Sequence, residues 1–134
     1  MIVVDTSALV AIYLGEPDAE ALAARIAGDE DPVMSVASFL ECTMVLRAKK
    51  RIAGAEADAW LEAFVGAAPI RLVEVDLDQA QLAREAHRRY GKGMGPSAQL
   101  NFGDCFAYAL ARSLDAPLLF KGNDFSQTDI VSAL

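Results

Sequence analysis

A chain of 134 residues that is 54% hydrophobic and 23% charged can bury a core of its own, so residues 1–134 are expected to form one ordered domain without disulfides. The composition excludes a disordered chain, and no apolar run approaches the roughly 18 residues that a membrane span needs, which predicts a cytoplasmic protein. The formal net charge of -7 disfavours long-range attraction to nucleic acid.

Short apolar stretches alternate with longer helical patterns along the whole chain. The strands are expected at residues 1–4, around 33–34, at 71–75 and at 118–120, with a small edge strand at 130–131. The helices are expected at residues 8–14, 19–27, 39–50, 55–65, 77–90 and from about 104 to 114. Strands separated by helices imply a mainly parallel central sheet covered on both faces, which is a three-layer α/β/α sandwich.

Four acidic residues follow the expected strands in a way that brings them to one edge of this sheet. Asp5 ends the first strand, Glu41 lies in the opening turn of the helix after the second, Asp104 opens a helix, and Asp124 follows the strand at 118–120. In open α/β sheets the carboxyl edge is where ligands bind. Each acid also has a purely structural interpretation: Asp5 and Asp104 as N-caps, Glu41 as part of a capping box with Ser38, and Asp124 as a turn residue.

Taken together, the four carboxylates predict a cation site. Acids that gather at one edge repel one another and become protonated unless cations hold them ionised. Oxygen ligands alone favour Mg²⁺ or Mn²⁺ over zinc, and such ions would also offset part of the negative charge. A site of this kind performs phosphoryl or phosphodiester chemistry.

Other polar residues near these acids have weaker signals. Three neutral residues are able to orient the acids, although turn and cap roles suit them as well: Thr6, Ser7 and Asn123. The end of the helix expected at 39–50 is basic and comprises Arg47, Lys49, Lys50 and Arg51. These cations either stabilise the negative end of the helix dipole or contact phosphate. Lys121 either contacts a substrate phosphate or faces solvent. His87 is expected to have no catalytic part, and Cys42 and Cys105 are expected to be buried free thiols.

Four segments of the chain together resemble one known family. The opening IVVDTSAL, the helix SFLECTMVLRAKK, the stretch LNFGDCFAYALAR and the ending LLFKGNDFSQTDI are similar, in order and spacing, to the PIN-domain ribonuclease toxins of the VapC family. The resemblance implies an endoribonuclease that uses Mg²⁺ or Mn²⁺, cleaves RNA and is inhibited by a cognate VapB-like antitoxin in a type II toxin-antitoxin pair.

The resemblance also implies the residues of the site. Asp5, Glu41, Asp104 and Asp124 match the acidic quartet of the family, whose fourth position varies, so Asp124 either ligates the metal or supports the other acids. Members of the family commonly form homodimers, and the antitoxin tail packs beside the active site.

Three other functions are compatible with the same residues. A phosphatase with an aspartyl nucleophile at Asp5 usually has a second aspartate two residues later, where this chain has Ser7. A binding module would use the acids only as caps and would not bind divalent metal. A nuclease acting on structured DNA would share the fold, but this chain has no evident extension for gripping a duplex.

Overall fold

The computed structural model describes residues 1–50, 54–97 and 99–134, without the side chain of Lys50. Arg51, which the sequence assigns to a basic helix end, lies outside these residues. The strands are β1 (Ile2–Val4), β2 (Pro32–Ser35), β3 (Arg71–Val73) and β4 (Leu118–Leu119). The helices are α1 (Thr6–Leu14), α2 (Ala19–Ala27), α3 (Val36–Lys50), α4 (Gly54–Ala67), α5 (Leu77–Tyr90) and α6 (Phe102–Leu114).

The four strands form one parallel sheet in the order β3-β2-β1-β4. In the register, Val3 of β1 lies beside Val33 on one side and Leu118 on the other. The predicted parallel α/β sheet is therefore confirmed. The predicted edge strand at 130–131 is wrong, because the described chain there makes only an isolated parallel bridge between Leu118 and Ser132.

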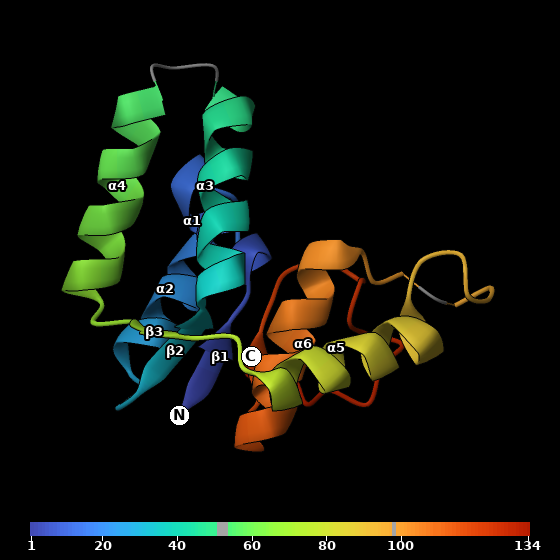
Figure 1. Ribbon diagram of the computed structural model, residues 1–134. Coiled ribbons are helices and arrows are strands. Elements are labelled where there is room, and N and C mark those ends of the chain that lie inside the picture. The colour runs from blue at the N-terminus through green and yellow to red at the C-terminus, as the bar shows by residue number, and fades with distance from the viewer. Residues whose placement is uncertain (51–53, 98) are drawn as a thin grey trace.

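The sheet separates two apolar cores, so the predicted three layers are present. Alternate residues of β1 point to opposite faces, as strand geometry requires. Ile2 and Val4 join a core with helices α1 to α4, whereas Val3 joins a second core with α5 and α6. Figure 1 shows α3 and α4 side by side on one side of the sheet and the α5 and α6 pair on the other.

The start of α3 differs from the sequence prediction. The helix begins at Val36, directly after β2, and the Oγ atom of Ser35 accepts a hydrogen bond of 3.2 Å from the Ala37 N–H. Ser38 is consequently a buried residue inside the helix. The predicted capping box of Ser38 with Glu41 is therefore wrong, and Glu41 lies in the second turn of α3 rather than the first.

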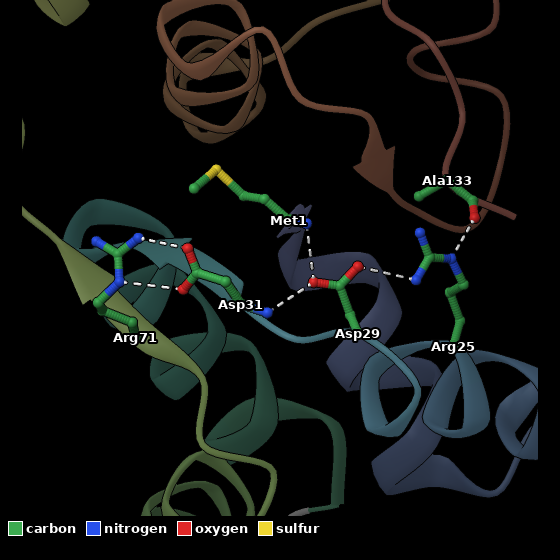
Figure 2. Close-up of polar contacts among 6 residues, drawn as sticks. All are labelled: Met1, Arg25, Asp29, Asp31, Arg71 and Ala133. Carbon is green, nitrogen blue, oxygen red and sulfur yellow. Dashed lines mark hydrogen bonds and ion pairs between the residues drawn. The ribbon is translucent and has the colours of Figure 1, made fainter.

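At the amino ends of the strands, acidic side chains are matched by cations. The amino group of Met1 lies 3.2 Å from Asp29 Oδ1, and Arg25 Nη1 lies 3.1 Å from Asp29 Oδ2. The Asp31 N–H donates to Asp29 Oδ1, and the Asp31 carboxylate accepts two hydrogen bonds from the Arg71 guanidinium. Figure 2 shows this network, which ties the loop before β2 to the starts of β1 and β3.

Two further predictions concern the whole chain. Cys42 and Cys105 are buried free thiols, as predicted, and burial raises the pKa of both, that of Cys42 to about 12. Within the described ranges, none of the helices has the combined length and apolar character needed to cross a membrane.

Candidate active site

A cavity of about 450 Å³ lies at the carboxyl edge of the sheet, and all four predicted acids line it. Asp5 comes from the end of β1, Glu41 from α3, Asp104 from the first turn of α6, and Asp124 from the turn after β4. The parallel topology brings these four segments together, because the strand ends and the following helix starts share one edge. The structure thus places the quartet around one cavity, and the roles of its members stay predictions.

The Asp5 carboxylate is held by the hydrogen bonds that cap helix α1. Asp5 is the N-cap of α1, as predicted, and its Oδ2 atom accepts hydrogen bonds from the Ser7 N–H at 3.0 Å and from Ser7 Oγ at 2.6 Å. Its Oδ1 atom is buried and has no hydrogen-bond partner in the part of the chain that the structure describes. One oxygen of this carboxylate is therefore fixed, and the other is buried and unsatisfied.

The strand end at β4 helps to fix Ser7 in turn. The Lys121 N–H donates a hydrogen bond of 3.0 Å to Ser7 Oγ, while the Lys121 ammonium group pairs with Glu16 and, at 3.0 Å, with Asp18 Oδ1. Lys121 and Glu16 both line the cavity. Lys121, which the sequence suggests as a phosphate contact, is therefore already paired with two acids of the loop after α1.

Asp104 is the third residue of α6, not its N-cap, so that part of the sequence prediction is wrong. Asn101 is the N-cap: its Oδ1 atom accepts from the Asp104 N–H at 2.9 Å, and Asp104 Oδ2 accepts from the Asn101 N–H at 3.0 Å. This reciprocal capping box fixes the side chain of Asp104 at the cavity wall. Asn101 also lines the cavity, and its spacing of three residues from Asp104 is the signal that sequence reasoning missed.

Glu41 and Asp124 line the cavity from two different segments, α3 and the turn after β4. The half-buried Glu41 side chain extends from α3 to the backbone of Gly103 in α6. Asp124 is exposed, and it follows Gly122, whose φ of 98° is a left-handed conformation that glycine adopts readily. Asp124 is the most solvated member of the quartet, which suits a supporting role as well as a ligating one.

The acids perturb one another because they are close and partly dehydrated. Burial raises the pKa of Asp5 to about 6, with a smaller contribution from the charge of Glu41, and this outweighs the hydrogen bonds from Ser7. Burial raises the pKa of Asp104 to about 7, aided by the charges of Asp5, Asp124 and Glu41 and opposed by the Asn101 N–H. Near neutral pH the site therefore retains protons that a cation would displace.

The donor set fits a hard divalent cation such as Mg²⁺ or Mn²⁺. The unsatisfied Oδ1 of Asp5 and the raised pKa of Asp104 are what a carboxylate site without its counter-charge should show. In the described residues, no three His, Cys, Asp or Glu side chains converge closely enough to enclose a metal. Mg²⁺ does not need such a cage, because it usually keeps several waters and binds one or two carboxylates.

The remaining candidates divide between structural contacts and the cavity wall. Thr6 lines the cavity, and its Oγ1 atom donates to the Ser38 carbonyl at 3.1 Å, which ties α1 to α3. Asn123 lines a different hollow. Arg47 pairs with Asp58 of α4, so it serves the helix pair rather than the site. Lys49 does line the cavity, and it makes no ion pair with any described residue.

His87 belongs to a second hollow of about 680 Å³. That hollow lies between α5 and the start of α6 and is lined mainly by apolar side chains, among them Leu100, Phe102 and Phe106. His87 is exposed and does not line the acidic cavity. Its predicted lack of a catalytic part stays a prediction.

Comparison with known proteins shows similarity over nearly the whole chain. The PIN domain family matches residues 2–131. The protein named Ribonuclease VapC from Mycolicibacterium smegmatis is 50% identical over 131 residues, which are 97% of this chain and 98% of that protein.

Two solved structures share the fold. The structure of Mycobacterium tuberculosis VapC20, described as a sarcin-ricin loop cleaving toxin, has a TM-score of 0.75 at 21% identity and covers 98% of this chain and 97% of its own. A toxin-antitoxin complex from Klebsiella pneumoniae has a TM-score of 0.73 at 15% identity, with coverage of 100% and 98%. These similarities confirm the three-layer fold.

Proposed function

Because this chain belongs to the PIN domain family, and within it to the VapC proteins, we propose that it is the toxin of a type II toxin-antitoxin pair and a Mg²⁺- or Mn²⁺-dependent endoribonuclease. The observation that carries the proposal is the cavity at the carboxyl edge, where carboxylates from four separate segments meet. The buried, unsatisfied Oδ1 of Asp5 supports a cation as the missing partner of this site.

The roles of the acids follow from how firmly each is held. Asp5 and Asp104 would hold the cation, because Ser7 and Asn101 fix one oxygen of each carboxylate and leave the rest of the group for binding. Glu41 and Asp124 would complete the set from α3 and from the turn after β4. When bound, the divalent ion activates a water and offsets the charge that develops on phosphodiester oxygens.

The proposal also needs a positively charged side chain that contacts the RNA. The net charge of -7 opposes RNA binding, and the Lys121 ammonium group is paired with Glu16 and Asp18. Lys49 lines the cavity two turns along α3 from Glu41, which corresponds to roughly 12 Å of helix. Lys49 is therefore the residue proposed to contact a phosphate next to the cleaved one.

Two protein partners complete the proposal, a cognate VapB-like antitoxin and a second copy of the chain. The support is apolar surface close to the acids: Leu40 and Phe102, which immediately precede Glu41 and Gly103, are 60% and 81% exposed. Large apolar side chains in such positions mark interaction surfaces. Light scattering on the isolated chain tests the homodimer, and loss of RNA cleavage upon addition of the purified antitoxin tests the inhibitor.

The decisive experiment is cleavage of total RNA by the purified protein with Mg²⁺ or Mn²⁺, with and without EDTA. The Asp104→Asn variant removes the charge but retains an oxygen for the capping box with Asn101. Discrete, EDTA-sensitive cuts that fall by roughly 100-fold or more in this variant are the expected result. Asp78→Asn is the matched control, because Asp78 is an exposed acid in the first turn of α5, outside the cavity, and its variant should cleave normally.

Other results would favour the alternative functions. Hydrolysis of a small phosphomonoester with RNA left intact would indicate a phosphatase with Asp5 as nucleophile. Calorimetry that detects no Mn²⁺ binding to the wild type would indicate a binding module. Cuts that persist at full rate in Asp104→Asn would remove this acid from the site and contradict the proposed mechanism.

A further inference from the structure

Gly103 lies where the first turn of α6 meets the side chain of Glu41. A Cβ atom at residue 103 would overlap Oε2 and Cδ of Glu41 and would lie 2.8 Å from its Oε1. The carboxylate of Glu41 thus occupies the space that any other residue at position 103 would fill with its own side chain. Gly103 also directly precedes Asp104, so the Glu41 carboxylate lies against the turn of α6 that carries Asp104.

The backbone does not require glycine at this position. Gly15, Gly93 and Gly122 have positive φ angles and open space where a Cβ would be, so their conformation accounts for them. Gly103 is helical and has no positive φ. In a helix glycine is less favourable than alanine, so the backbone conformation gives no reason for glycine at residue 103.

We propose that Gly103 is a positioning residue: the absence of its side chain lets the Glu41 carboxylate reach from α3 to the first turn of α6 and join Asp5 and Asp104 at the cavity. This inference rests on the proposed function, in which the same acids hold a divalent cation. A methyl group at residue 103 would push the Glu41 carboxylate away, while the partly exposed side chain has room to move without unfolding the protein.

The test compares four proteins: wild type, Gly103→Ala, Glu41→Ala and the double variant. Mn²⁺ affinity, measured by calorimetry without RNA, is expected to fall about 10- to 100-fold in Gly103→Ala and not to fall further when Glu41 is already alanine. Urea unfolding of the metal-free proteins gives a second reading. Gly103→Ala should stabilise the Glu41→Ala background, where only helix propensity acts, more than it stabilises the wild type.

Gly66→Ala is the matched control. Gly66 is also helical, in α4, and a Cβ atom there would meet nothing within 4 Å. This variant should keep the Mn²⁺ affinity of the wild type and gain a little stability. If Gly103→Ala fails to fold while Gly103→Ala with Glu41→Ala folds, the steric contact is demonstrated directly.

Three results would overturn the inference. One is an unchanged Mn²⁺ affinity in Gly103→Ala alongside a reduced affinity in Glu41→Ala. Another is an equal loss of affinity from Gly103→Ala in both backgrounds, which would mean that Gly103 acts independently of Glu41. The third is urea unfolding without coupling between the two sites. An unchanged affinity in Glu41→Ala itself is different, because it contradicts the metal role in the proposed function while the unfolding data still report the contact.

Discussion

The two edges of the parallel sheet place the same side chain in opposite environments. At the carboxyl edge, burial and neighbouring acids raise the pKa of Asp5 and Asp104. At the amino edge, burial would raise the pKa of Asp29, but hydrogen bonds from the Asp31 N–H, Arg25 and the amino terminus outweigh it and lower that pKa. Arg71 likewise lowers the pKa of Asp31 (Figure 2).

Under the proposed function, this difference separates acids that stabilise the fold from acids that serve the reaction within one sheet. An acid with cationic partners stabilises the folded chain in its ionised form, whereas buried acids without a counter-charge destabilise it. The chain provides partners at the amino edge, where Arg25 and Met1 surround Asp29. At the carboxyl edge neither Asp5 nor Asp104 has a cationic partner among the described residues, which is the reason to expect a bound cation there.

The largest expected effect comes from exchanging one acid at each edge for asparagine. Asp5→Asn should reduce RNA cleavage by roughly 100-fold or more, because Asp5 is proposed to hold the cation. The protein should stay folded, because the variant removes a charge that the metal-free fold does not balance. Asp29→Asn should keep its activity per folded molecule and lose on the order of 1–3 kcal/mol of stability, because it weakens contacts with Arg25 and the amino terminus. Cleavage assays and urea unfolding of both variants provide the measurements.

The two edges would have to be assigned anew if the effects were reversed. A large loss of stability with normal cleavage in Asp5→Asn would make that residue a structural cap. A loss of cleavage in fully folded Asp29→Asn would extend the functional region to the amino edge. Either result would end the separation of roles.

A smaller effect concerns the pH dependence of stability without metal. Asp5 and Asp104 have pKa values of about 6 and 7 in the folded protein, above the ordinary value of 3.8, so the folded state binds more protons between pH 4 and 7. Their stabilising contribution is full below about pH 4 and is lost as the pH rises through 6 and 7, at no more than roughly 1.4 kcal/mol per pH unit for each group. Asp29 and Asp31 act in the opposite sense, and their contribution is lost as the pH falls below about 4.

Urea unfolding of the EDTA-treated protein from pH 4.5 to 8 measures this dependence. The free energy of unfolding should decline from pH 5 to 7.5, and the decline should be shallower in Asp104→Asn, which has one fewer group to ionise. Mn²⁺ should reverse the decline in the wild type, because the ion binds the ionised acids of the folded state. A wild-type stability that rises between pH 5 and 7.5 would contradict the charge distribution at the carboxyl edge.

Local patterns in the sequence predict much of this arrangement. Helices α2 and α5 begin and end where start signals and the amphipathic pattern predict, at Ala19–Ala27 and Leu77–Tyr90. The position of Asp5 also follows from local rules, because a polar residue after a buried strand both ends the strand and caps the next helix. The common edge of the four acids follows from the parallel topology alone.

Contacts between distant segments are what the sequence does not reveal. The sequence predicts too late a start for α3, because Ser38 has the sequence features of a cap, whereas Ser35 at the end of β2 accepts the hydrogen bond from the Ala37 N–H. The fit of Glu41 against Gly103 depends on how closely α3 approaches α6, which neither segment encodes by itself. The ion pair of Asp31 with Arg71 likewise joins residues 40 positions apart, across two neighbouring strands.

The smallest expected effect lies within the amino edge itself. The Asp29 side chain is 7% exposed, whereas those of Asp31 and Arg71 are 39% and 54% exposed. Solvent and salt screen exposed pairs, so Asp31→Asn should destabilise the protein less than Asp29→Asn, and added NaCl should shrink the difference between Asp31→Asn and wild type further. Urea unfolding at low and high salt measures both effects. Equal losses of stability in the two variants would show that pairing with a cation, and not burial, determines what an acid contributes to stability at this edge. The contrast with the carboxyl edge would then depend on counter-charge alone.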